Sequence, residues 1–157
     1  MKNRIRLAIL LIVIAIFPIP TAQAKQTPSF YARSVILIEI DSGRVLYEKQ
    51  AHTRIPMAST TKIMTALIVL EKANMDDIVT VSKRAAQIGG STMNLELGEK
   101  ISVMGLMYGL MLRSGNDAAI ALAEHVAGSV EEFCEMMNQK AREIGAYDTL
   151  FQNVNGL

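Results

Sequence analysis

A nearly continuous apolar run at residues 35–40 (VILIEI) restricts the folds open to this chain. Such a run is typical of a strand that is buried on both faces, so other elements must cover both sides of its sheet. Residues 41–44 predict a turn, and residues 45–47 predict the returning strand of a hairpin. An isolated two-stranded hairpin is only marginally stable in water, and the sequence shows no further strand. We therefore expect a chain that lacks part of its sheet.

Apolar residues at helical spacing dominate the remainder of the chain. Helices are expected over residues 60–72, 103–112, 117–127 and 130–144. Ser102 and Ser129 are predicted N-caps, and Gly128 is predicted to end a helix. Residues 79–98 lack periodicity and contain adjacent glycines, so we expect irregular structure there. A hairpin followed by several helices predicts the α/β (α+β) class.

The N-terminus has the order of a secretory signal peptide. Positive charges come first, at Lys2, Arg4 and Arg6. The apolar run 7–17 would rise about 16 Å as a helix, well short of a roughly 30 Å hydrocarbon core. Residues 22–24 (AQA) form a cleavage site of the A-x-A type. We predict a signal peptide at 1–24 and an exported chain at 25–157, acting in the periplasm or on the extracytoplasmic face of a bacterial membrane.

Composition excludes several classes of protein. A single cysteine cannot form an internal disulfide, and no cluster of cysteine and histidine has the spacing of a zinc site. The net charge is only +1, without a basic run beyond the N-terminus, which argues against nucleic acid as a partner. An exported chain with one cysteine suits a bacterial envelope protein that does not rely on disulfides.

Ser59 and Lys62 form an S-x-x-K tetrad at a predicted helix start. Residues i and i+3 share one helix face, so the Lys62 amine can reach the Ser59 hydroxyl. A hydroxyl is a weak nucleophile and needs a base, which Lys62 supplies only when neutral. Its pKa must therefore be lowered by burial or by a nearby cation. The alternative is a serine N-cap beside an unrelated surface lysine.

Ser114 and Asn116 lie in a predicted break between two helices, where side chains can point into a cleft. Ser114 could hydrogen-bond the Lys62 amine and relay a proton. The Asn116 amide could hold both Lys62 and a substrate carbonyl. The alternative is an ordinary loop, because serine, glycine and asparagine all favour turns.

Together these motifs resemble those of the serine penicillin-recognising enzymes. The S-G-N form of the second motif is similar to that of the D-alanyl-D-alanine carboxypeptidases, the low-molecular-weight penicillin-binding proteins. Three segments carry the resemblance: residues 40–47 (IDSGRVLY), 56–66 (PMASTTKIMTA) and 108–119 (YGLMLRSGNDAA). The resemblance implies a β-lactamase/penicillin-binding-protein-like transpeptidase fold, here with an N-terminal hairpin and the helical cluster that carries the active site.

The resemblance also implies a reaction. Ser59 would attack the carbonyl between the two terminal D-alanines of a peptidoglycan pentapeptide stem, with Lys62 as base and Ser114 and Asn116 as its partners. An acyl-enzyme would form, D-alanine would leave, and water would release the stem. β-Lactam antibiotics would acylate Ser59, and no cofactor or metal is implied. Membrane association would need a C-terminal segment that this sequence does not contain.

The chain departs from the family pattern in one motif. No Lys-Thr-Gly occurs in it, and Val154 stands where the family usually has proline. We therefore expect the first part of a catalytic domain, inactive and poorly stable by itself. The alternatives are a non-catalytic remnant that binds stem peptides or partners, and a class A β-lactamase-like hydrolase, which Gly115 disfavours.

Four other residues are assigned structural roles. Cys134 lies on or beside an apolar helix face and is expected to be a small buried hydrophobe. His125 shows nothing resembling a catalytic triad, and His52 is expected to be exposed in a loop. Arg113 is expected to pack or pair structurally.

Overall fold

The computed structural model describes residues 29–157. The predicted signal peptide, with its cleavage site, lies outside the described residues. The chain divides into two compact units, Met1–Ala51 and His52–Leu157, and each is described by itself.

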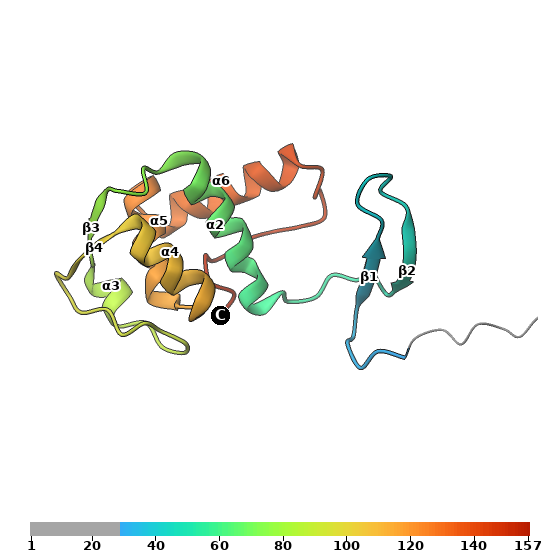
Figure 1. The fold of residues 1–157 in the computed structure, drawn as a ribbon, viewed down its shortest axis with the longest axis horizontal. Coiled ribbons are helices and arrows are strands. Elements are labelled where there is room, and N and C mark those ends of the chain that lie inside the picture. The colour runs from blue at the N-terminus through green and yellow to red at the C-terminus, as the bar shows by residue number, and fades with distance from the viewer. Residues whose placement is uncertain (1–28) are drawn as a thin grey trace, which may run out of the picture. The chain divides into compact units, whose positions relative to one another are not determined.

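The first unit contains the predicted hairpin (Figure 1). Strands β1 (Val35–Ile38) and β2 (Val45–Lys49) pair antiparallel, with a register shift between Leu37 and Ile38. In the turn, the Glu39 carboxylate accepts hydrogen bonds from the backbone N–H groups of Asp41 and Ser42, at 3.0 and 2.8 Å. These bonds hold the turn that the sequence predicted.

The expected burial of β1 on both faces is wrong for the described residues. The side chains of Ile36, Leu37 and Ile38 are each more than half exposed. Among the described residues β1 pairs with β2 alone. An apolar run shows that a strand can be buried, but burial also requires further elements against its faces.

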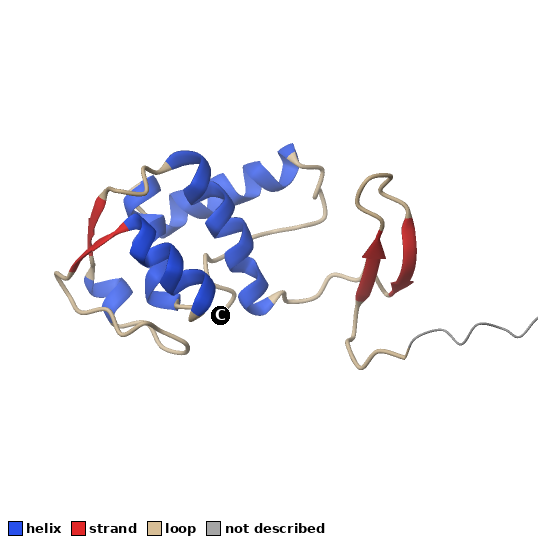
Figure 2. Cartoon of the chain, viewed as in Figure 1, coloured by secondary structure: helices blue, strands red, loops and turns tan. Residues whose placement is uncertain are grey.

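The second unit is mainly helical (Figure 2). Its elements, in chain order, are the 3-10 turn η1 (Ala58–Thr60), α2 (Thr61–Lys72), β3 (Ile78–Thr80), α3 (Lys83–Ala86), β4 (Lys100–Ser102), α4 (Val103–Leu112), α5 (Asn116–Ala127) and α6 (Val130–Glu143). Helix α5 is the centre of the unit and packs against α2, α3, α4 and α6. Every residue of α5 from Asn116 to Ala123 is buried. Its four buried alanines present little side-chain bulk to the neighbouring helices.

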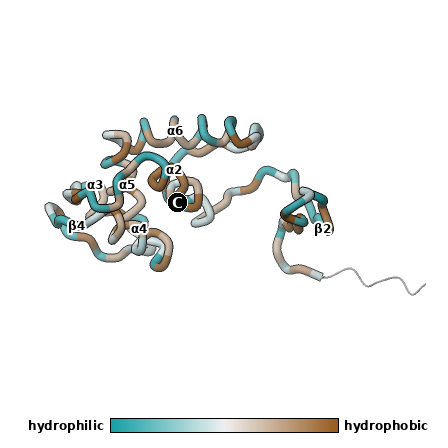
Figure 3. Tube along the Cα trace, turned by 45° about the horizontal axis from the view of Figure 1, so that its top comes forward, coloured by the Kyte–Doolittle hydropathy of each residue, from teal (hydrophilic) through white to brown (hydrophobic). Residues whose placement is uncertain are grey.

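The predicted helix ends are confirmed to within one residue. The Ser102 hydroxyl accepts from the Gly105 N–H, and the Ser129 hydroxyl accepts from the Glu132 N–H, both at 3.1 Å. Gly128 ends α5 with φ of +81°, a conformation that glycine adopts without steric cost. Figure 3 shows hydrophilic segments recurring along α6, as expected for a helix with one face on the core.

The expectation of irregular structure at residues 79–98 is wrong in part. Strand β3 pairs antiparallel with β4, from Ile78 opposite Ser102 to Thr80 opposite Lys100, and α3 lies between them. The described residues therefore hold two small sheets rather than one hairpin. Strands of three residues are too short for an alternating pattern to identify them.

Candidate active site

Ser59 lies in turn η1, directly before α2, as the sequence predicted. The N-cap of α2 is Thr60, not Ser59, and the Thr60 side chain makes no cap hydrogen bond to the helix. The residue before it, Ala58, has φ of +48°, a left-handed conformation that is unusual for a residue with a Cβ. Ser59 itself is exposed. A helix start with an exposed hydroxyl leaves Ser59 accessible to an incoming molecule.

Lys62 occupies the first turn of α2 and is only 3% exposed. Its Nζ atom lies 3.4 Å from the Ser59 hydroxyl oxygen. The same amine donates to the backbone carbonyl of Asn155 at 2.8 Å. Burial lowers the pKa of the Lys62 amine, because a charged ammonium loses hydration in the interior. The alternative, an N-cap serine beside a surface lysine, is wrong, because Thr60 is the N-cap of α2 and Lys62 is buried.

The C-terminal segment 151–156 returns to the start of α2 (Figure 1). The Thr65 hydroxyl donates to the carbonyl of Val154 at 2.7 Å, one helical turn beyond the Lys62–Asn155 bond. Sequence reasoning missed this partner of Lys62. In the sequence, segment 151–156 is marked only by two apolar residues, Phe151 and Val154, and by a glycine at position 156.

Ser114 and Asn116 lie in the predicted break between α4 and α5. Ser114 is partly buried and has φ of +54°. The Asn116 side-chain amide donates to the carbonyl of Gly89 at 2.8 Å, and its backbone N–H donates to the carbonyl of Ser91 at 2.8 Å. In the described structure, neither Ser114 nor Asn116 forms a hydrogen bond with Lys62. The arrangement leaves one amide hydrogen and the amide oxygen of Asn116 for other partners.

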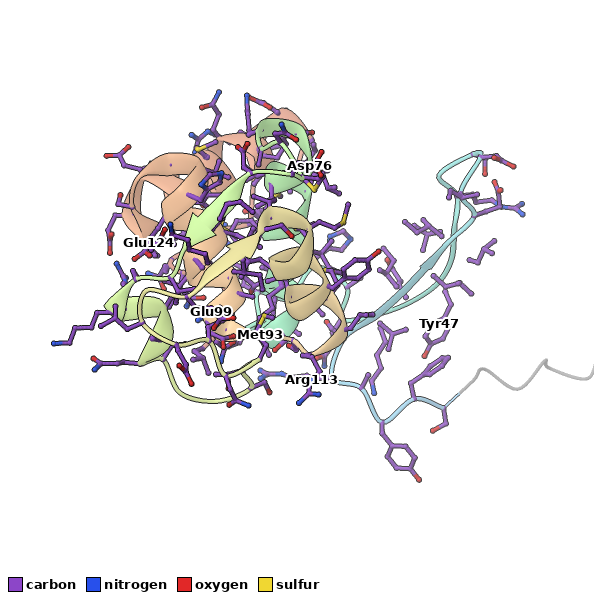
Figure 4. The ribbon with its side chains drawn as sticks, turned by 60° about the vertical axis from the view of Figure 1, so that its left-hand side comes forward. Tyr47, Asp76, Met93, Glu99, Arg113 and Glu124 are labelled. Atoms are coloured by element: carbon purple, nitrogen blue, oxygen red, sulfur yellow. The ribbon has the colours of Figure 1, made fainter. Side chains whose placement is uncertain are left out.

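Asp117 anchors the loop that faces Asn116. Its carboxylate is buried and accepts from the backbone N–H of Met93 at 3.0 Å and of Leu95 at 3.1 Å. Figure 4 labels Met93 in this loop. A negative charge in the first turn of α5 is also favoured by the positive end of the helix dipole. Sequence reasoning did not single out Asp117, although an aspartate directly after Asn116 is a first-turn signal.

The remaining candidates lie apart from this cluster. Cys134 is buried as predicted, and burial raises the pKa of its thiol, which keeps it unreactive. The Nε2 atom of His125 lies 3.3 Å from a carboxylate oxygen of Asp77, in keeping with a structural role. His52 is exposed, as expected. Arg113, labelled in Figure 4, is exposed and forms no ion pair with another described residue, so the expected pairing is not observed.

Residues 29–157 contain no group of three or more histidine, cysteine, aspartate or glutamate side chains placed to hold a metal ion. In the same part of the chain, no helix has the length and apolar character needed to cross a membrane.

Comparison with known proteins agrees with the resemblance seen in the motifs. Residues 21–157 match the model of the peptidase S11 family, described as D-alanyl-D-alanine carboxypeptidase. The chain is 44% identical over 149 residues to the D-alanyl-D-alanine carboxypeptidase DacF of Bacillus subtilis, covering 88% of this chain and 38% of that protein. It is 43% identical over 153 residues to DacC of Escherichia coli, with the same coverages.

Solved structures give the same result. The D-alanyl-D-alanine carboxypeptidase of Mycobacterium tuberculosis superposes with a TM-score of 0.81 at 31% identity, covering 87% of this chain and 51% of that one. DacD of Francisella tularensis gives a TM-score of 0.79 at 36% identity, covering 84% of this chain and 33% of that one. The chain thus spans less than two thirds of these relatives. Its motifs, its fold and the family match agree, and the chain belongs to the D-alanyl-D-alanine carboxypeptidase family, peptidase family S11.

Proposed function

We propose that this chain supplies the nucleophile and the general base of an exported serine D-alanyl-D-alanine carboxypeptidase that trims peptidoglycan stems. The observation that carries the proposal is the buried Lys62 amine, 3.4 Å from the exposed Ser59 hydroxyl. Because burial lowers the pKa of Lys62, a larger fraction of this amine is neutral than of a lysine in water. Only the neutral amine can accept the hydroxyl proton.

The reaction follows from these two groups. The Ser59 oxygen attacks the carbonyl carbon between the two terminal D-alanines while its proton passes to Lys62. The backbone N–H of Ser59, near the start of α2, can donate to the oxyanion that forms. The C–N bond then breaks, and the leaving amine of D-alanine takes a proton from Lys62. Water hydrolyses the resulting ester, which frees Ser59 and the shortened stem.

Ser114 and Asn116 are assigned supporting roles. The break between α4 and α5 exposes part of Ser114, whose hydroxyl can relay the proton between Lys62 and the leaving amine. Asn116 is fixed by its bonds to Gly89 and Ser91, so its remaining amide groups have a defined direction for a substrate carbonyl. β-Lactams, which also present an acylating carbonyl, are proposed inhibitors that acylate Ser59. The site of action is the extracytoplasmic side of the membrane.

A chimera with a relative tests the proposal. Residues 25–157 are joined to the part of the Bacillus subtilis relative that lies beyond the matched region. We expect the folded chimera to bind a fluorescent penicillin covalently and to release D-alanine from a stem-peptide analogue. Ser59→Ala should abolish both, whereas Ser42→Ala, in the hairpin turn, should abolish neither. Labelling that persists without the Ser59 hydroxyl would overturn the assignment. Stem binding without release by a folded chimera would instead indicate a non-catalytic module.

A further inference from the structure

Asn138, on the buried face of α6, holds the backbone of Phe151 through both ends of its amide. Its Nδ2 donates to the Phe151 carbonyl at 2.9 Å, and its Oδ1 accepts from the Phe151 N–H at 2.7 Å. Asn138 is 8% exposed and Phe151 is 7% exposed. A buried amide that satisfies both backbone groups of one residue fixes the position and the direction of the chain at that residue.

The chain leaving Phe151 runs directly to the candidate site. The Val154 carbonyl accepts from Thr65, and the Asn155 carbonyl accepts from Lys62. At Gly156, which has φ of +84°, a Cβ would overlap the carbonyl oxygen of Ala58. Three successive residues therefore contact α2 and the turn that carries Ser59.

We propose that Asn138 is a positioning residue for the Ser59–Lys62 pair, acting by clamping Phe151 so that segment 151–156 covers Lys62 and supports the Ser59 turn. The catalytic role of Asn138 rests on the proposed function, but its effect on the Lys62 amine can be measured without catalysis. Asn138 touches neither Ser59 nor Lys62 by a hydrogen bond, and its hydrogen-bonded link to them runs through the segment.

The physical link is the environment of the Lys62 amine. Helix α2 presents this amine to one backbone carbonyl, that of Asn155, and to the Ser59 hydroxyl. If the segment loosens, water reaches the amine and replaces the carbonyl as its hydrogen-bond partner. The cost of burying the charge then disappears, and the pKa of Lys62 moves up toward that of an ordinary lysine. A protonated Lys62 no longer accepts the proton of Ser59.

Competitive acetylation of lysine amines, measured by mass spectrometry across a pH series, tests the link on the full 157-residue chain. In the unchanged protein we expect Lys62 to titrate below its ordinary range and to react more slowly than Lys72, which lies exposed at the other end of α2. Asn138→Ala should move the titration midpoint of Lys62 upward and raise severalfold its limiting rate above that midpoint, where the amine is neutral and only access of the reagent limits the reaction. The Lys72 rate should not change.

Val79→Ala is the matched control, because Val79 is buried in β3 and has no hydrogen bond to the segment. It should lower the melting temperature without changing the acetylation of Lys62. If Asn138→Ala does not fold, Asn138→Asp keeps the acceptor for the Phe151 N–H and should give an intermediate rate. An unchanged rate and midpoint for Lys62 in a folded Asn138 variant would overturn the proposal, as would an equal effect of Val79→Ala.

The same variants separate this inference from the proposed function. In the chimera described above, Asn138→Ala should move the pH profile of penicillin acylation to higher pH, and Val79→Ala should not. If the chimera folds but is never acylated, the proposed function fails, while the acetylation of Lys62 still decides the role of Asn138. If acylation occurs with an unchanged profile in folded Asn138→Ala, the inference fails and the function stands.

Discussion

The Lys62 amine lies 2.8 Å from the backbone carbonyl of Asn155, which is 93 positions further along the chain. This bond joins the first turn of α2 to the C-terminal segment, and it gives a backbone acceptor to the amine that also lies 3.4 Å from the Ser59 hydroxyl. A carbonyl in this position orients the amine without adding a counter-charge that would hold its proton. The cost of burying the ammonium therefore remains the main influence on its pKa.

Lys62→Arg is expected to lower penicillin acylation of the chimera by at least about a hundredfold. Guanidinium stays protonated at all relevant pH values, so it keeps the charge but cannot act as a base. Stopped-flow or gel-based labelling with a fluorescent penicillin measures the rate. Lys72→Arg, at the far end of α2, should acylate normally. A near-normal rate for Lys62→Arg would show that another group is the base.

Lys62→Met is expected to change how stability depends on pH. Since burial lowers the folded-state pKa of Lys62, the unfolded chain binds the extra proton between that lowered pKa and about 10.4. The unchanged protein should therefore gain stability relative to Lys62→Met as pH rises through this window, and lose it as pH falls. Urea unfolding of both proteins at a series of pH values gives the difference. A difference that is constant with pH would contradict the lowered pKa.

Asp117→Asn is expected to destabilise the protein by about 3 kcal/mol. The amide would retain one oxygen for the N–H groups of Met93 and Leu95 and would turn an N–H₂ donor toward them. The exposed Asp148, paired with Arg54 on the surface, is the control, and Asp148→Asn should cost less than about 1 kcal/mol. Chemical denaturation measures both. Equal losses would mean that Asp117 does not anchor the loop.

Local signals account for what the sequence predicted well. Helix α4 begins and ends as expected, because Ser102 caps it and the apolar run stops at Leu112. The Ser59–Lys62 spacing needed only the geometry of one helical turn. Both features depend on residues that are close in the chain.

Long-range contacts account for what it missed. The acceptor for Lys62 is a backbone carbonyl, which every residue possesses, so the residue type at position 155 does not predict this bond. The bond between Asn116 and Gly89 likewise depends on how the loop folds over α5. The pairing of β3 with β4 joins strands too short to show a period. These features required the tertiary structure.

Gly156→Ala is expected to disturb the Ser59 turn, and Gly145→Ala provides its control. Both glycines have φ of +84°, so an alanine at either site meets the same backbone cost, about 1 kcal/mol. Only at position 156 would the new Cβ also overlap the carbonyl oxygen of Ala58, whereas position 145 is open. We expect Gly156→Ala to cost about 2 kcal/mol more, because packed backbone must move apart.

Gly156→Ala and Gly145→Ala should also differ in the rate of penicillin acylation. The Ala58 carbonyl belongs to the residue before Ser59, so moving it shifts the nucleophile relative to Lys62. In the chimera, Gly156→Ala should slow penicillin acylation at temperatures where it remains folded, and Gly145→Ala should acylate at the normal rate. Circular dichroism melts and fluorescent labelling measure the two effects. Equal melting temperatures and equal acylation for the two variants would show that segment 151–156 yields to the added methyl group and does not support the turn.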